Sequence, residues 1–119
     1  MKKRYRIKKN SEIDAIYQKK KVAHSQHFGL YHDVDPKAQH FRFAISIGKK
    51  YGNAVERNLL KRRVRMIIHD FKIHIHPQAL VLLVVRPQAK RLSFQAMKDE
   101  ISLLLHKLKL MELNYEQTL

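Results

Sequence analysis

The sequence predicts an α+β fold, in which a single domain forms a two-layer α/β sandwich with helices laid on one small sheet. The chain has 119 residues, a length that suits one domain with one core. Some segments repeat apolar residues every three to four positions and others alternate them, as helices and strands do. These segments follow the order α-β-β-α-β-α, with no internal repeat and no linker rich in Gly, Ser or Pro. Residues 1–119 are therefore expected to fold as one unit.

The first predicted element is a short helix over about residues 11–20. Ser11-x-x-Asp14 has the pattern of a capping box, which marks a helix start. Apolar and aromatic residues then follow at helical spacing: Ile13, Ile16 and Tyr17. Before this helix, residues 1–9 form a basic N-terminal arm.

Two strands are predicted next. Residues 22–32 carry Phe28, Leu30 and Tyr31 without a helical period, which predicts a strand, whole or broken. A turn follows at residues 33–36, which contain two Asp and one Pro. Apolar side chains then alternate with smaller or polar ones over residues 41–47, the pattern of a strand with one buried face.

The second half of the chain predicts a helix, a strand and a final helix. Asn53, with Glu56 three residues later, is a good helix start, and this helix is expected to extend to about Lys72. Residues 79–85 are an unbroken run of Ala, Leu and Val, which fits a strand buried on both faces at the centre of the core. Apolar residues spaced by three and four predict the last, amphipathic helix from about Ser93 to Lys109.

Composition excludes several classes of protein. The chain has no cysteine, so disulfides, thiolate zinc sites, iron–sulfur clusters and cysteine nucleophiles are excluded. The basic start lacks the apolar stretch of a signal peptide, and the longest apolar run, residues 79–85, is far shorter than a membrane span. We expect a soluble protein of the cytoplasm with no membrane partner.

Positive charge is abundant and unevenly distributed. Lys and Arg number 25 against 10 Asp and Glu, which gives a formal net charge of +15. Residues 1–21 and residues 41–72 each hold nine of these basic residues against two acidic ones, whereas acids slightly outnumber bases from Lys98 onward. The N-terminus and the middle of the chain are therefore expected to form a binding surface for a nucleic acid, and the C-terminal segment to be scaffold.

The middle helix has one packing face and one basic face. At about 100° per residue, the apolar stripe contains Leu60, Val64, Ile67 and Phe71. Cationic and amide side chains are predicted on the opposite, free side: Arg57, Asn58, Lys61, Arg62 and Arg65. Arg side chains bind phosphate oxygens in pairs and Lys adds point charge, so this face suits an RNA backbone. The alternative is a solvated helix face, although such faces usually interleave opposite charges.

Residues 49–65 closely resemble the signature of the protein subunit of bacterial ribonuclease P. In that family the helix begins with Arg-Asn-Arg and continues with Lys-Arg and a later Arg. The residues that match are Arg57, Asn58, Lys61, Arg62 and Arg65, and Leu59 departs from the pattern at the second Arg. The resemblance covers nearly the whole chain and includes the paired Lys49 and Lys50, which it implies are phosphate contacts.

The resemblance also implies a fold and a second binding site. The implied fold is ribosomal-protein-like, with a left-handed strand–helix–strand crossover, whereas general physics predicts the right-handed form. A cleft between the first helix and the sheet would hold the single-stranded 5′ leader of precursor tRNA, and the matching positions are Ile13, Tyr17 and Tyr31. Aromatic side chains there can stack on unpaired bases. The alternative is that Ile13 and Tyr17 only anchor the first helix to the core.

These observations predict the protein cofactor of ribonuclease P, with ribonuclease P RNA and precursor tRNA as partners. Catalysis and Mg²⁺ would belong to the RNA subunit and its substrate, because the scattered acids offer no protein-based catalytic site. The eight histidines lack a coordinating spacing, so no metal site is expected in the protein. Neither a helix-turn-helix nor a zinc-finger pattern is present, so no DNA partner is expected, although the charge taken by itself also fits a DNA-binding protein.

Two alternatives remain from the sequence. One is a ribosome-associated or general structured-RNA-binding protein with no part in tRNA processing. The weaker one is an autonomous metal-dependent nuclease. A preference for substrates with a 5′ leader separates the first from the cofactor, and cleavage by protein alone identifies the second. The polar tail, residues 112–119, is expected to fray.

Overall fold

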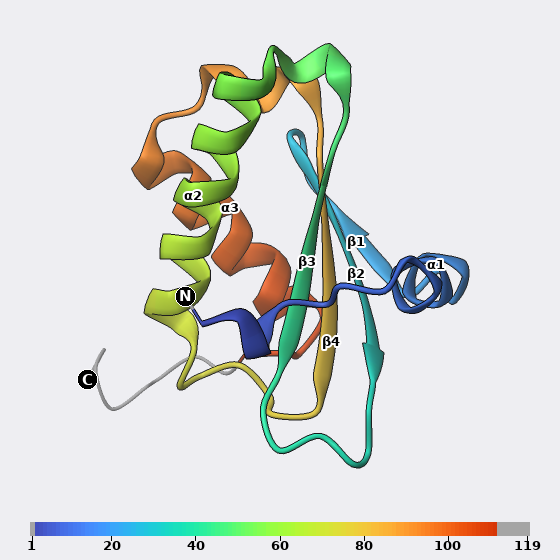
Figure 1. Ribbon diagram of the computed structural model, residues 1–119. Coiled ribbons are helices and arrows are strands. Elements are labelled where there is room, and N and C mark those ends of the chain that lie inside the picture. The colour runs from blue at the N-terminus through green and yellow to red at the C-terminus, as the bar shows by residue number, and fades with distance from the viewer. Residues whose placement is uncertain (1, 112–119) are drawn as a thin grey trace, which may run out of the picture.

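A mixed sheet of four strands is the centre of the computed structural model, which describes residues 2–111 (Figure 1). The strands are β1 (Val22–His24), β2 (Phe28–Val34), β3 (Arg42–Ile47) and β4 (Ala79–Val85), and their order across the sheet is β1-β2-β4-β3. β2 pairs antiparallel with both β1 and β4, whereas β3 pairs parallel with β4. β3 is therefore an edge strand of the sheet.

Helices lie on both faces of this sheet. The two longer ones, α2 (Ala54–Phe71) and α3 (Phe94–Lys107), cover one face, and the short α1 (Asn10–Gln18) lies against the other (Figure 1). Three 3₁₀ turns complete the structure: η1 (Lys3–Tyr5), η2 (Lys49–Tyr51) and η3 (Pro87–Arg91). The expected α+β fold is confirmed, and α1 adds a partial third layer to the two predicted ones.

The connection from β3 through α2 to β4 is left-handed. Both strands ascend in Figure 1, β3 lies in front of β4, and α2 descends on the left. Seen from the helix side, the chain thus moves leftward from one strand to the next. This is the handedness that the family resemblance implies, whereas connections between parallel strands through a helix are usually right-handed.

The strand predicted over residues 22–32 is two strands, so the order of elements is α-β-β-β-α-β-α. β1 and β2 form a hairpin around residues 25–27, where the backbone N–H of Ser25 donates to the carbonyl of Phe28 at 2.8 Å. The other predicted elements are confirmed, with bounds shifted by one or two residues. The predicted frayed tail lies outside the described residues.

Two apolar clusters hold the layers together. The larger one fills the space between the sheet and α2 and α3, and Leu60, Val64 and Ile67 of the predicted stripe are buried in it. The smaller one lies under α1, where Ile7, Ile16, Ala44 and Leu82 are buried. The alternation of β3 side chains explains this division, because Phe43 packs in the first cluster and Ala44 in the second.

α2 begins at a complete capping box. The side chain of Asn53 accepts from the backbone N–H of Glu56 at 2.9 Å, and the Glu56 carboxylate accepts from the backbone N–H of Asn53 at 3.0 Å. These bonds satisfy two donors that the first helical turn leaves without partners. The start of the basic helix is thereby fixed beside the edge of the sheet.

The N-terminal segment continues the sheet beyond β3. Arg6 forms a parallel bridge with Phe43, and the backbone N–H of Ile7 donates to the Phe43 carbonyl at 2.9 Å. In an extended segment neighbouring side chains point to opposite faces. Ile7 therefore packs under α1, and Arg6 extends toward α2.

Candidate nucleic-acid interface

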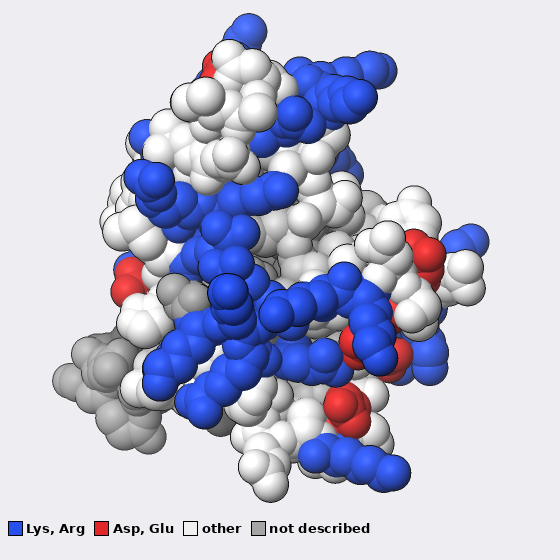
Figure 2. Space-filling model, in the orientation of Figure 1, with Lys and Arg blue, Asp and Glu red and all other residues white. Residues whose placement is uncertain are grey.

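Lysine and arginine side chains gather on one face of the molecule. Figure 2 shows them over α2 and the N-terminal segment, with few acidic side chains among them. Two ion pairs of the described residues reach α2, between Lys98 and Asp70 at 2.9 Å and between Lys90 and Glu56, but both use a cation from outside α2. This face is therefore strongly positive and free to attract phosphate.

The predicted basic row of α2 is partly sheltered rather than fully free. Arg57, Lys61 and Arg65, spaced by four residues, are half-buried on the flank of α2, whereas Asn58 and Arg62 are exposed. The prediction of one free face was wrong for the first three, and for Lys61 and Arg65 the reason is that Arg6 of the N-terminal segment and the edge strand β3 lie beside them. Within residues 2–111, none of the four cations of the row forms an ion pair.

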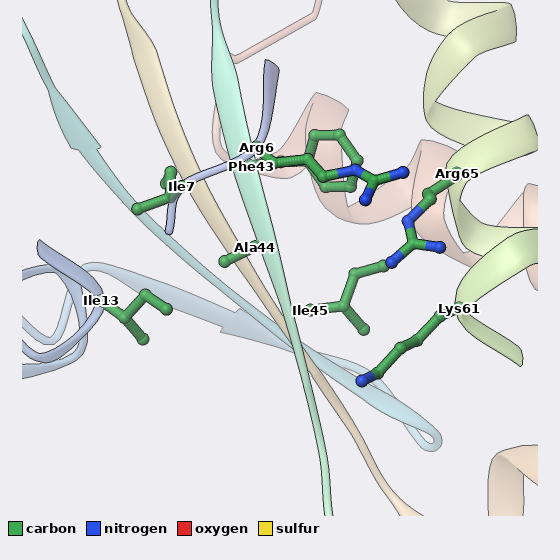
Figure 3. Close-up of a pocket in the computed structure, with 8 residues that line it drawn as sticks. All are labelled: Arg6, Ile7, Ile13, Phe43, Ala44, Ile45, Lys61 and Arg65. Carbon is green, nitrogen blue, oxygen red and sulfur yellow. The ribbon is translucent and has the colours of Figure 1, made fainter. Parts of the chain in front are cut away.

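A cavity of about 160 Å³ lies between α2, β3 and the N-terminal segment (Figure 3). Its lining combines apolar and cationic side chains: Arg6, Ile7, Ile13, Phe43, Ala44, Ile45, Lys61 and Arg65. Ile13 comes from the predicted leader cleft, and Lys61 and Arg65 come from the basic row. Ile13 of the predicted cleft and two cations of the basic row thus line one concave surface at the β3 edge of the sheet, whereas Tyr17 and Tyr31 are not among its lining residues.

The aromatic pair of the predicted cleft is formed. The rings of Tyr17 and Tyr31 lie 4.8 Å apart with an interplanar angle of 36°. Tyr17 is 52% exposed, whereas Ile16 beside it is 1% exposed. Ile16 is thus the residue that anchors α1, and Tyr17 offers an open ring for a further aromatic group. Burial, followed by the neighbouring Tyr17, raises the pKa of Tyr31, so this phenol stays neutral near pH 7.

Sequence reasoning missed two neighbours of this pair. The His24 ring meets Tyr31 edge-on at 6.2 Å, and an Arg86 nitrogen donates to His24 Nδ1 at 3.1 Å. Gly29 lies opposite His24 in the hairpin, and a Cβ on Gly29 would come within 3.1 Å of that ring nitrogen. These positions follow from the hairpin register, for which the sequence carries no short-range signal.

A carboxylate of α3 holds the turn of the β1–β2 hairpin. Glu100 accepts from the Ser25 hydroxyl at 2.5 Å, the His27 backbone N–H at 3.0 Å and the His27 Nδ1 at 2.8 Å. Burial acts to raise the pKa of Glu100, but these hydrogen bonds together outweigh it, and the pKa lies below the ordinary value. Glu100 thereby fixes the hairpin that carries His24 and Tyr31.

Near the start of α2, the interface combines exposed lysines with exposed apolar side chains. Lys49 and Lys50 lie exposed in η2, which the buried ring of Tyr51 anchors to the core. Leu59, the departure from the family pattern, is 42% exposed, and Val55 one turn earlier is 77% exposed. An apolar strip thus lies on α2 close to the cations.

Two negative findings concern the described residues alone. Residues 2–111 contain no group of three or more His, Cys, Asp or Glu arranged to hold a metal ion. None of the helices in this range is long and apolar enough to cross a membrane.

Comparison with known proteins identifies the family. The family model described as Ribonuclease P matches residues 1–109. A ribonuclease P protein component of Acholeplasma laidlawii is 43% identical over 112 residues, which are 94% of this chain and 96% of that protein. A ribonuclease P protein component of Enterococcus faecalis is 36% identical, over 94% of this chain and 95% of that one.

Solved structures agree with this similarity. An RNase P protein of Staphylococcus aureus superposes with a TM-score of 0.84 at 32% identity, over 91% of this chain and 98% of that one. An RNase P protein of Thermotoga maritima shares the fold, with a TM-score of 0.75 over 85% of this chain and 96% of that one, at 23% identity. By sequence, by fold and by the matched motif of α2, this chain belongs to the ribonuclease P protein family.

Proposed function

We propose that the chain is the protein cofactor of ribonuclease P and promotes removal of the 5′ leader from precursor tRNA. The proposal follows from family membership together with one observation. The row of cations on α2 forms no ion pair within residues 2–111, and the aromatic pair of Tyr17 and Tyr31 lies beside α1. Ile13 of α1 and Lys61 and Arg65 of α2 line one cavity at the β3 edge of the sheet, which connects the two regions. Phosphate-binding and base-stacking groups are the two requirements for holding RNA with unpaired bases.

The basic row would bind the catalytic RNA. Arg57, Lys61, Arg62 and Arg65, with Asn58 among them, present guanidinium, ammonium and amide donors, and Lys49 and Lys50 extend the charge past the start of α2. Each cation placed on a phosphate releases a condensed counterion, so the binding is expected to weaken steeply as salt increases. Screening of repulsion between the catalytic RNA and its substrate follows from the same charges.

The leader would lie along Ile13, Tyr17 and Tyr31. Tyr17 presents an open ring on which an unpaired base can stack, and Ile13 offers an aliphatic wall. Because every base has an aromatic face, this contact tolerates different leader sequences. Hydrolysis itself is assigned to the RNA subunit, with Mg²⁺ bound by that RNA and its substrate, and the polypeptide contributes binding and orientation.

Cleavage of a precursor tRNA at near-physiological Mg²⁺ and salt tests the proposal. The three arms are a bacterial ribonuclease P RNA alone, this protein alone and the two together. Stimulation only in the mixture is the expected result. Absence of stimulation with a competent RNA would favour a general structured-RNA-binding protein, and cleavage by the protein alone would place a catalytic site in the polypeptide.

A further inference from the structure

Two arginines from distant parts of the chain meet beside α2. Arg6 lies in the N-terminal segment, Arg65 lies in the basic row, and Figure 3 shows their guanidinium groups turned toward one another. Both are half-buried, and within residues 2–111 the Nε atoms of both are buried without a hydrogen-bond partner. A buried donor without an acceptor is costly, and two like charges side by side repel. The described part of the chain thus leaves both Nε donors unsatisfied.

Within residues 2–111, the surroundings of this pair supply two cavities and one acidic side chain, which already has a cationic partner. Arg6 and Arg65 line the 160 Å³ cavity on one side and a second cavity of about 380 Å³ on the other. Arg62 and His69 also line the second cavity, and so does Asp70, whose carboxylate already accepts from Lys98 Nζ at 2.9 Å. Burial, followed by the charge of Arg6, lowers the pKa of Arg65, which agrees with a missing anion.

We propose that Arg6 and Arg65 together bind one phosphate group of an RNA backbone, so that the N-terminal segment is part of the RNA interface. This inference rests on the proposed function for its RNA partner. Two guanidinium forks match the oxygens of one phosphate, and a single anion between them satisfies both orphaned Nε groups. Either the catalytic RNA or the leader of the substrate could supply this phosphodiester, since their backbones have the same chemistry.

The site depends on the parallel bridge between Arg6 and Phe43, which forms when the N-terminal segment folds against β3. The bridge and the hydrogen bond from Ile7 hold the Arg6 backbone against β3, so its side chain is directed toward α2 before any ligand arrives. Such prior ordering reduces the entropy cost of binding. Arg57 also has a buried Nε without a partner among residues 2–111, but it lines neither of the two cavities.

Titration of the free protein with inorganic phosphate at constant ionic strength tests the site without RNA. The probes are the arginine Nε–Hε signals in nitrogen-15 NMR spectra. The signals of Arg6 and Arg65 are expected to shift with one common Kd. Arg6→Gln is expected to raise the phosphate Kd measured on the Arg65 signal roughly tenfold. Arg6→Lys keeps the charge but loses the planar guanidinium, so it is expected to raise this Kd less.

The control is Lys37→Gln, which removes one charge from the exposed turn between β2 and β3 and is expected to change nothing. Backbone spectra of each variant establish that it is folded. If phosphate shifts neither signal, or if folded Arg6→Gln leaves the Arg65 titration unchanged, the site does not exist.

Binding measurements with RNA identify the source of the phosphate. If the catalytic RNA supplies it, Arg6→Gln lowers the slope of log K against log salt for that RNA by about one. If the leader supplies it, Arg6→Gln weakens binding of precursor tRNA and leaves mature tRNA unaffected. If Arg6→Gln changes neither the salt dependence nor the binding of precursor tRNA, the assignment of the phosphate to RNA is overturned. Failure of the wild-type protein to stimulate cleavage would instead reject the proposed function and leave the phosphate titration standing.

Discussion

Replacement of Glu100 by Gln is expected to loosen the β1–β2 hairpin and destabilise the fold. Glu100 accepts three hydrogen bonds from Ser25 and His27, and its side chain and that of His27 are only 17% and 14% exposed. Hydrogen bonds to a charged group contribute about 1.5–3 kcal/mol each, and the Gln amide keeps an acceptor on one side only. The expected loss in the free energy of unfolding is about 2–3 kcal/mol.

Thermal and denaturant unfolding measure this loss. For a chain of 119 residues the unfolding entropy converts each kcal/mol into about 4 °C, so the Tm of Glu100→Gln is expected to fall by roughly 8–12 °C. The matched control is Asp99→Asn on the same helix, because within residues 2–111 the exposed Asp99 carboxylate accepts only from the Gln95 side chain, at 2.9 Å. Equal stability of the two variants would refute the role given to Glu100.

The pH dependence of this difference gives an independent check. The pKa of Glu100 in the folded protein lies below its ordinary value, so the carboxylate stabilises the fold fully above the ordinary pKa of a glutamate. That contribution is lost as the pH falls through the lowered pKa. The stability gap between wild type and Glu100→Gln is therefore expected to shrink below about pH 4.5. A gap that widens toward acid pH would contradict the assignment.

Three further substitutions test the α2 interface. Arg62→Ala is expected to reduce the slope of log K against log salt for the catalytic RNA by about one, whereas Lys37→Gln leaves it unchanged. Leu59→Arg adds a cation at a 42% exposed position, so the slope of log K against log salt is expected to become steeper by about one. Urea unfolding is expected to show no loss of stability in this variant. Asn53→Ala removes the capping box and is expected to lower the free energy of unfolding by about 1 kcal/mol, measured in the same way.

The sequence predicted those elements whose pattern is local. The capping box at Asn53 and the run of apolar residues in β4 define their own boundaries, and the structure confirms both. The β1–β2 hairpin is different, because residues 25–27 contain neither Gly nor Pro to mark a turn. Its turn is held by Glu100, more than seventy residues away in the chain. A period-two pattern on both sides of such a turn looks like one strand.

The site was predictable as a set of residue types but not as a shape. Helical periodicity places Arg57, Lys61 and Arg65 on one side of α2, yet it cannot show that they are half-buried, or that Lys61 and Arg65 share a cavity with the N-terminal segment. Arg6 belongs to a run of basic residues in which nothing distinguishes it locally. Its pairing with Arg65 depends on a bridge to β3, which is a tertiary contact.

Substrate affinity with and without a 5′ leader tests most directly whether α2 and the aromatic pair beside α1 are separate surfaces that bind two different RNAs. The measurement compares precursor and mature tRNA on the assembled complex of catalytic RNA with wild-type, Tyr17→Ala or Arg62→Ala protein. Tyr17→Ala is expected to lose the leader-dependent part of the affinity, about 1–3 kcal/mol for one stacked base, and to assemble normally. Arg62→Ala is expected to weaken assembly and to keep the leader preference once assembled. Equal loss of precursor and mature tRNA binding in Tyr17→Ala would contradict the division into two surfaces.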